Sequence, residues 1–292
     1  TGTPSLIMML SAGFNILLDP LLIFGLAGFP ELGLVGAAWA TVASRAITLV
    51  AAMLVLKFKE NMLSSHFPDL QETFWCWRDV LTVGLPAAGS NMINPISIGV
   101  ITSLLATHGS LAVAGFGVAS RVESFAMIAL MALGASMGPF VGQNWGAGKV
   151  DRVEEGLKQG FFFCVGWGIC MAILLAAIAP HIARIFNTDP NVVSIAIQYL
   201  WIVPISYGTA GIIQVASSAF NALGKPIPAV ILTVLRMFAL YIPLAYLGSR
   251  WFGPIGIFAA ATVANVIVGI IAYIWSLRET AVKGTKLSSK PL

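Results

Sequence analysis

The chain alternates long apolar runs with short polar breaks. A helix that spans a bilayer needs about 20 predominantly apolar residues. Eight runs reach this length, and they cover residues 3–25, 33–56, 79–107, 111–142, 157–180, 190–221, 226–247 and 254–277. The breaks between them hold Gly, Pro and charged residues, which end helices. The pattern therefore predicts an all-α polytopic membrane protein with eight transmembrane helices.

Composition supports a membrane protein and excludes a soluble enzyme. Of the 292 residues, 58% are hydrophobic and 10% are charged, whereas soluble domains have about 25% charged residues. The mean hydropathy is +0.90. The HExxH metalloprotease pattern does not occur, and the three cysteines lack metal-ligand spacing. We expect no enzyme activity and no resident cofactor.

Basic residues divide unequally between the alternating loops. Cytoplasmic loops of membrane proteins are enriched in Lys and Arg. One side holds two basic residues, Arg184 and Arg250, and the other side holds eleven. The eleven are Lys57, Lys59, Arg78, Lys149, Arg152, Lys158, Lys225, Arg278, Lys283, Lys286 and Lys290. We therefore place the side with eleven, and the C-terminus, in the cytoplasm.

An internal repeat relates the first two spans to the last two. A shift of 223 residues gives eight identities among the 22 positions from 17 to 38, including a Pro and two Gly. The eight pairs are Leu17 and Leu240, Pro20 and Pro243, Leu21 and Leu244, Gly25 and Gly248, Phe29 and Phe252, Gly33 and Gly256, Ala37 and Ala260, and Ala38 and Ala261. Internal repeats are the usual construction of secondary transporters.

The repeat predicts how the chain divides into lobes. Four spans precede the second pair in its unit, so four helices are expected before the first pair as well, giving twelve helices in two lobes of six. We expect 1–56 to be the last two helices of an N-terminal lobe and 57–78 a cytoplasmic inter-lobe linker. Residues 79–277 are then a six-helix C-terminal lobe, and 278–292 a cytoplasmic tail.

An acidic residue inside the first span is the leading candidate for chemistry, because ionisable residues within a membrane are costly and usually functional. Asp19 shares a helix face with Asn15, four residues earlier, and Thr41 on the next span falls at a similar depth. A carboxylate, an amide and a hydroxyl suit a proton or Na⁺. The alternative role is structural: Asp19 pairs with Arg45, or caps a break at Pro20.

Other residues within the spans are candidates for a substrate cavity. Arg121 and Glu123 are two positions apart and do not face each other, so each either contacts another helix or contacts substrate. Arg236 either stabilises carbonyls or faces a further helix. Met127 and Met131 suit an adaptable apolar pocket, although methionines also fill cores. Prolines within spans, such as Pro95, line a cavity, form a hinge or only kink the helix.

Several motifs resemble the multidrug and toxic compound extrusion (MATE) exporters. NILLDPLLIFG from Asn15 to Gly25 and GLVGAAWAT from Gly33 to Thr41 resemble the fifth and sixth helices of that family. Gly84-Leu85-Pro86 and GQNWGAG from Gly142 to Gly148 resemble the start of its second bundle. The resemblance implies a two-lobed exporter in the inner membrane of a bacterium, driven by a gradient of H⁺ or Na⁺.

The resemblance also assigns site residues. Asn15, Asp19 and Thr41 match the polar cluster of the DinF-like branch, so Na⁺ or H⁺ is expected at Asp19. In the NorM-like branch the second lobe carries acids, but here Asn94 stands at one of those positions, and 190–221 has no acid. This departure favours coupling through Asp19 and leaves Asn94 as a residue of the substrate cavity.

The expected function is therefore cation-coupled antiport, which exports amphipathic and often cationic organic compounds by alternating access. The expected partners are membrane lipid and a small organic substrate, without nucleic acid, and we expect a monomer. A flippase for a lipid-linked glycan is an alternative that would require a wide basic lumen, and a scaffold without transport activity is a further one.

Overall fold

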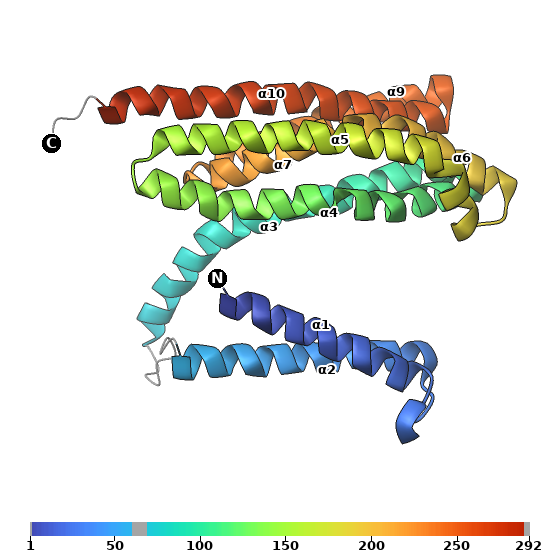
Figure 1. Cartoon of the computed structure of the whole chain (residues 1–292), viewed down its shortest axis with the longest axis horizontal. Coiled ribbons are helices and arrows are strands. Elements are labelled where there is room, and N and C mark those ends of the chain that lie inside the picture. Colours follow the sequence, from blue (N-terminus) through green and yellow to red (C-terminus); the bar gives the residue numbers. More distant parts are fainter. Residues whose placement is uncertain (1, 60–68, 289–292) are drawn as a thin grey trace. The chain divides into compact units, whose positions relative to one another are not determined.

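The computed structural model describes residues 2–59 and 69–288, and each regular element within these ranges is a helix. Contacts divide the chain into two compact units, Thr1–Val80 and Leu81–Leu292. The first unit holds α1 (Gly2–Ile23), the 3₁₀ turn η1 (Leu26–Gly28), α2 (Gly33–Leu54), the π-helical turn η2 (Val55–Lys59) and the start of α3 (Leu70–Ala106). Figure 1 shows both units.

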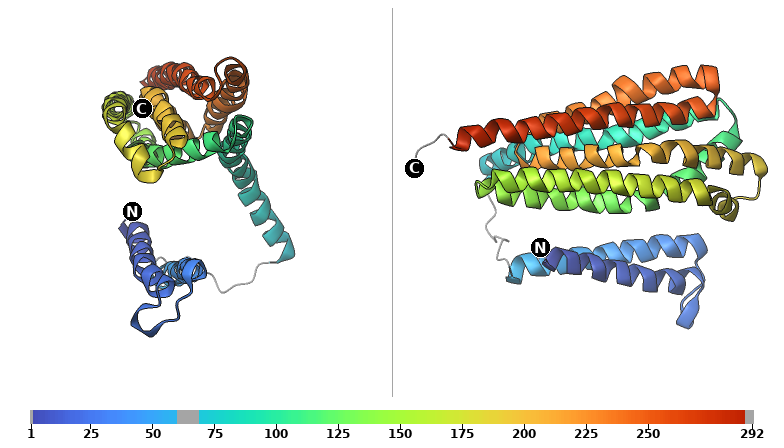
Figure 2. Two further views of the ribbon diagram at one scale, coloured as in Figure 1. Left: turned by 90° about the vertical axis from the view of Figure 1, so that its right-hand side faces the viewer. Right: turned by 45° about the horizontal axis from the view of Figure 1, so that its top comes forward.

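The second unit is a bundle of long helices joined by tight turns (Figures 1 and 2). It contains the rest of α3, then α4 (Ser110–Gly146), α5 (Val150–Phe186), α6 (Pro190–Ile202), the 3₁₀ turn η3 (Val203–Ser206), α7 (Tyr207–Ala222), α8 (Pro226–Val234), the π-helical η4 (Leu235–Tyr241), α9 (Ile242–Phe252) and α10 (Pro254–Ser288).

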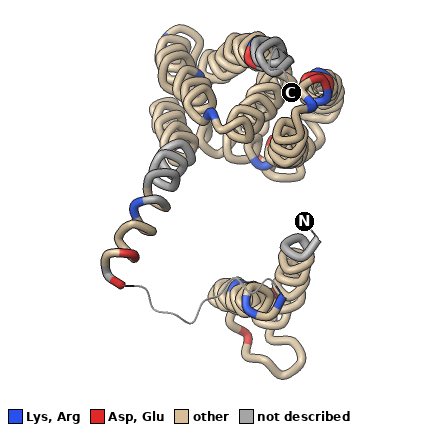
Figure 3. The backbone as a smooth tube through the Cα atoms, turned by 90° about the vertical axis from the view of Figure 1, so that its left-hand side faces the viewer, with Lys and Arg blue, Asp and Glu red and all other residues tan. Residues whose placement is uncertain are grey.

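The all-α membrane architecture is confirmed. Seven helical segments of the described chain are long and apolar enough to cross a membrane, against the eight predicted. They are Leu6–Ile23, Gly33–Lys59, Ser110–Gly146, Val150–Phe186, Pro190–Ala222, Pro226–Phe252 and Pro254–Glu279. The third predicted span falls in α3, whose described apolar stretch is the shorter Met92–Ala106. Figure 3 shows how few charged positions interrupt the helices.

Two helices extend beyond the runs that predicted them. Helix α3 begins at Leu70, inside the segment assigned to the linker, and α10 continues to Ser288, inside the segment assigned to the tail. Both extensions are polar, and hydropathy detects only the part of a helix that lipid surrounds. Residues 60–68 of the expected linker and 289–292 of the expected tail lie outside the described part of the chain.

Helices α1 and α2 form a tightly packed antiparallel hairpin. The α2 face toward α1 carries its three buried residues, Gly36, Ala40 and Ser44, at the four-residue spacing of one helix side. A Cβ at Gly36 would lie 2.3 Å from the Leu22 carbonyl oxygen, so only glycine permits this approach. Small residues at such seams are typical of membrane helices.

Helix α7 lies at the centre of the second unit and packs against α4, α5 and α10. Its backbone touches α5 where Gly208 meets Gly168, since a Cβ at Gly168 would lie 2.3 Å from the Gly208 nitrogen. On another side, a Cβ at Gly269 of α10 would lie 2.6 Å from the Thr209 Cβ. Glycines thus bring three helices to backbone contact in a buried apolar core.

Two spans of the second unit depart from α geometry near a proline. Pro204 lies in the 3₁₀ turn between α6 and α7, and Pro243 follows η4. Proline lacks an N–H and its ring crowds the carbonyl four residues earlier. The wider turns of η4 accommodate this crowding without ending the span, which is a common origin of π-helical segments.

Contacts in the second unit place its turns at two opposite ends. Lys225, between α7 and α8, forms an ion pair with Glu279 near the end of α10. At the other end, His108 of the α3–α4 turn lies 2.7 Å, from Nε2 to Oγ, from Ser249 of α9. The alternation of basic and non-basic turns in this unit therefore corresponds to its two ends.

Candidate functional site

The polar residues of α1 are in contact with each other. The Asn15 Nδ2 donates to the Asp19 Oδ1 at 3.4 Å, one helical turn apart. Both side chains are half-buried. This amide holds one oxygen of the carboxylate and leaves the other for a ligand.

Thr41 lies about one turn away from the carboxylate along the hairpin. The Leu32 nitrogen donates to the Leu22 oxygen at 3.1 Å, and the Ser11 Oγ donates to the Ser44 oxygen at 3.3 Å. This antiparallel register, together with the Gly36 contact to the Leu22 carbonyl, puts Thr41 between about half a turn and one and a half turns of helix from Asp19. Thr41 is exposed, and its Oγ1 donates to the Ala37 oxygen at 2.9 Å.

The structural alternatives for Asp19 find no support in this unit. Arg45 is exposed, and the same register places it opposite Ser11, about two turns from Asp19. No ion pair joins these two described side chains. Helix α1 continues through Pro20 to Ile23 without a break that Asp19 could cap. Asp19 is therefore a membrane carboxylate that contacts an amide and no cation within the described hairpin.

The second unit contains another polar cluster, formed by residues of four elements. The Tyr199 hydroxyl of α6 donates a hydrogen bond to the Glu123 carboxylate of α4. The Arg236 Nη2 of η4 donates to the Asn94 Oδ1 of α3 at 3.3 Å. Tyr199 is 4% exposed, whereas Glu123 and Arg236 are half-buried and Asn94 is exposed. We refer to these four residues as the α4–η4 cluster.

The charged members of the α4–η4 cluster do not touch. Glu123 and Arg236 lie within electrostatic range of each other, but they form no ion pair within 4.0 Å among the described residues. Within the described part of the chain, the buried Arg236 Nε has no hydrogen-bond partner, and neither has the buried Tyr207 hydroxyl nearby. Buried polar groups are normally hydrogen-bonded to protein, water or a ligand, so these two groups mark a place where a polar partner fits.

The structure separates the other residues predicted to line a cavity. Met127 shares the α4 face of Glu123 and packs half-buried against the core, and Met131 is 58% exposed one turn further along. Pro95 and Arg121 are exposed. Arg121 lies on the opposite side of α4 from Glu123, since two residues correspond to about 200° of helical rotation.

Sequence reasoning missed two features of the α4–η4 cluster. Tyr199 lies in an apolar run without a local pattern that marks it as a partner for Glu123. Asn94 and Arg236 are 142 residues apart, and their contact follows only from the packing of α3 against η4. The usable signal was the high cost of each charged residue within a span.

A GxSxG pattern, which serine hydrolases use as a nucleophile elbow, occurs at Gly134-Ala135-Ser136-Met137-Gly138. Here it lies within the continuous helix α4. The Ser136 Oγ donates to the Leu133 oxygen at 2.8 Å. The strand-to-helix turn that exposes a catalytic serine is therefore not formed by this segment.

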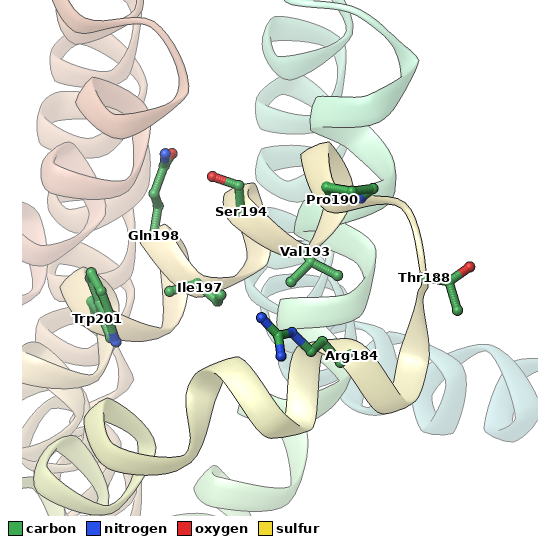
Figure 4. Close-up of a pocket in the computed structure, with 8 residues that line it drawn as sticks. All are labelled: Arg184, Thr188, Pro190, Val193, Ser194, Ile197, Gln198 and Trp201. Atoms are coloured by element: carbon green, nitrogen blue, oxygen red, sulfur yellow. The ribbon is translucent and has the colours of Figure 1, made fainter.

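A pocket of about 620 Å³ lies where α5 turns into α6 (Figure 4). Figure 4 shows the Arg184 side chain rising toward Val193 and Ile197, with Ser194 and Gln198 on the other side of α6. Thr188, Pro190 and Trp201 complete the lining. None of the ion-coupling or substrate-cavity residues that the sequence predicts lines this pocket.

Comparisons with known proteins agree on one family. The MatE family model matches residues 86–247. A FAD transporter of Shewanella oneidensis is 37% identical over 94% of this chain and 60% of its own length. The multidrug export protein MepA of Staphylococcus haemolyticus is 28% identical over 93% of this chain and 59% of its own length.

Solved structures show the same fold. The MATE transporter VcmN of Vibrio cholerae in its bent form matches with a TM-score of 0.80 and 29% identity, over 98% of this chain and 64% of VcmN. An outward-facing MATE family transporter of the MOP superfamily matches with a TM-score of 0.81 and 23% identity, over 98% of this chain and 63% of that protein. The chain thus spans about 60% of the length of these relatives.

Proposed function

Because the chain belongs to the MatE family of multidrug and toxic compound extrusion transporters, a family of multi-pass inner-membrane proteins, we propose that it forms most of a cation-coupled exporter. Residues 1–56 supply the last two helices of the first lobe and 79–277 supply the second lobe. Alternating access between the lobes moves an amphipathic organic compound outward. The C-terminus is cytoplasmic, and the transporter acts as a monomer without nucleic acid.

Asp19 is the proposed site of ion coupling. The observation that carries this assignment is the Asn15–Asp19 contact on a membrane helix, with no ion pair in the described hairpin. A carboxylate in a low-dielectric site gains from binding H⁺ or Na⁺, because either cation removes an uncompensated charge. Occupancy of Asp19 by the ion then favours one conformation of the first lobe over the other.

The number of oxygen donors bears on the choice of ion. Asp19, Asn15 and Thr41 offer four side-chain oxygens, of which one Asp19 oxygen already accepts from Asn15, and the Thr41 hydroxyl proton already goes to the Ala37 oxygen. A proton needs one carboxylate oxygen, whereas Na⁺ needs several oxygens at once. We therefore propose H⁺ as the coupling ion, with Na⁺ possible only if other parts of the transporter supply further ligands.

The test uses proteoliposomes of the intact transporter that contains this sequence. An imposed pH gradient should drive ethidium transport. The Asp19→Asn variant should abolish this transport, because an amide side chain does not take up and release a proton as a carboxylate does. Glu31→Gln, in the exposed loop between α1 and α2, is the matched control and should retain transport. Unchanged gradient-driven transport in Asp19→Asn would refute coupling at this site.

A second candidate concerns the substrate. The FAD transporter is 37% identical to this chain, whereas the multidrug relative MepA is 28% identical. This difference favours an aromatic, phosphate-bearing nucleotide as substrate. Proteoliposomes loaded with FAD or with ethidium distinguish the two substrates. Gradient-dependent efflux of FAD alone would support the nucleotide, and efflux of ethidium alone would support the multidrug function.

A further inference from the structure

Arg236 carries a positive charge that its neighbours satisfy only in part. A guanidinium has five N–H donors, and its one hydrogen bond from Nη2 to Asn94 is long, at 3.3 Å. Its Nε is buried and has no hydrogen-bond partner among the residues that the structure describes. Burial of an incompletely paired charge is costly, so this arrangement is unfavourable unless an anionic group completes it.

The carboxylate that could neutralise Arg236 is held elsewhere. The Tyr199 hydroxyl donates to Glu123 from α6, and α6 packs against α4. Tyr199 itself is fixed by edge-to-face contacts, with ring centroids 5.7 Å from Phe116 and 5.0 Å from Phe258. A rigid phenol thus keeps the carboxylate of Glu123 away from the guanidinium, and a donor face of Arg236 stays available.

The backbone around Arg236 is also unusual. Arg236 is the second residue of the π-helical segment Leu235–Tyr241. Segments of this kind occur often at functional sites, because they change the direction of a side chain within a continuous helix. Asn94 meets Arg236 from α3, next to Pro95. Two spans that contain proline therefore converge on this cation.

All four members of the α4–η4 cluster lie well inside the membrane. Counting about 1.5 Å per residue from the helix ends at the His108 side, their depths are roughly 14 to 24 Å. The hydrocarbon core is about 30 Å thick. Charged residues at this depth usually mark the pathway of a substrate or an ion, so a substrate group that reaches Arg236 can complete its hydrogen bonds.

We propose that Arg236 and Asn94 bind the anionic group, a phosphate or carboxylate, of the transported molecule. The guanidinium pairs with two oxygens of the anion, as such groups commonly do, and Glu123 remains with Tyr199. The inference rests on the proposed transport function and specifies its substrate class. It assigns cation coupling and anion recognition to different residues, Asp19 and Arg236.

The test measures binding of riboflavin and FMN to the purified intact transporter, by fluorescence in neutral detergent. These probes share one ring system and differ by a phosphate. Arg236→Gln should weaken FMN binding about tenfold or more and leave riboflavin binding unchanged, since it removes a charge-assisted contact. Arg236→Lys should restore part of the affinity. Arg250→Gln is the matched control, because Arg250 is exposed and contacts Tyr246 of its own helix.

Further measurements distinguish a folding defect, lipid binding and loss of ion coupling from loss of anion binding. If Arg236→Gln fails to fold, Asn94→Ala should still weaken FMN more than riboflavin. If phosphatidylglycerol displaces FMN from the wild type and binds more tightly than FMN, the site is a lipid site and the proposal is overturned. Asp19→Asn should lose gradient-driven transport but bind FMN normally, so failure of coupling is distinguishable from failure of this site. Equal affinity of FMN for wild type and Arg236→Gln would also overturn the proposal.

Discussion

The hairpin of α1 and α2 and its repeat, formed by α8, η4, α9 and α10, share a scaffold but differ in charge. Both hairpins depend on glycine for close approach: Gly36 packs on the Leu22 carbonyl, and a Cβ at Gly256 would lie 2.1 Å from the Gly248 oxygen. Close backbone approach is thus common to both hairpins but occurs at different positions, since Gly36 aligns with Ala259, and Gly256 aligns with Gly33, whose added Cβ would meet nothing within 4 Å.

The polar residues of the first hairpin are replaced by apolar residues in the second. Asn15, Asp19 and Thr41 align with Phe238, Ile242 and Ala264, as read from the shift of 223 residues. The second hairpin instead carries Arg236, at the position of Gly13 in the first. One hairpin thus carries a carboxylate and the other a guanidinium, so duplication of the fold did not duplicate its polar residues.

The prolines that the repeat aligns, Pro20 and Pro243, differ in the helix geometry that precedes them. Helix α1 passes through Pro20 as an α-helix, whereas the helix that contains Pro243 widens into the π-helical segment η4 before it. Proline alone is therefore insufficient to produce the π-helical segment. The widened turns occur in the hairpin that carries the cation.

The largest effect is expected from the close backbone contact within each hairpin. Gly36→Val and Gly256→Val should each remove most of the folded protein, because their side chains would meet backbone atoms that cannot move aside. Gly13→Ala is the control, since nothing lies within 4 Å of its Cβ. Size-exclusion chromatography and thermal unfolding measure the loss. Normal folding of either valine variant would contradict the close backbone approach in that hairpin.

The second largest effect is expected when the carboxylate is moved from the first hairpin to the matching position of the second hairpin. The double variant Asp19→Asn with Ile242→Asp should transport at least about a hundredfold more slowly than wild type under a pH gradient, because Phe238 cannot hold the new carboxylate in place as the Asn15 amide holds Asp19. Ile242→Asp alone is the control for the cost of the added charge. Recovery of transport by the double variant would show that the two hairpins are interchangeable.

A smaller effect is expected at Tyr199. Tyr199→Phe removes the hydroxyl that holds Glu123, so the carboxylate should turn toward Arg236 and reduce FMN affinity by several-fold. The stability loss should be about 1 kcal/mol, typical of a hydrogen bond within a membrane protein. Tyr246→Phe, whose hydroxyl bonds to exposed Arg250, is the control. Fluorescence titration and thermal unfolding measure the two effects.

The smallest effect is expected at Thr41. Thr41→Val should slow gradient-driven transport no more than a few-fold, because its hydroxyl proton bonds to Ala37 and it lies about a turn from Asp19. Asn15→Leu should slow it more, since Asn15 contacts the carboxylate directly. The comparison is made from initial transport rates. A larger loss at Thr41 than at Asn15 would place the ion nearer α2.

Much of the fold was accessible from the sequence because lipid imposes long apolar runs on each span. The repeat further predicted that α1 and α2 correspond to the last two spans. The polar start of α3 at Leu70 was missed, since hydropathy does not detect helix outside the membrane. The π-helical segment around Arg236 was missed because it depends on packing as well as on Pro243.

The candidate site was predictable in part for similar reasons. The Asn15–Asp19 contact follows from their four-residue spacing, which brings side chains together on any helix. The partnership of Glu123 with Tyr199 joins residues 76 positions apart on different helices. A single sequence contains no signal for such a tertiary pair, whereas it does mark each charged residue in a span as costly.

The most direct test of separate cation and anion sites measures two properties of each of two variants of the intact transporter. Proton exchange on substrate binding is followed with a pH dye in weakly buffered detergent, and FMN affinity is followed by fluorescence. Asp19→Asn should lose proton exchange and keep FMN affinity, and Arg236→Gln should keep proton exchange with riboflavin and lose FMN affinity. The division of roles between the two hairpins would be contradicted if either variant lost both properties, or if both variants kept both properties.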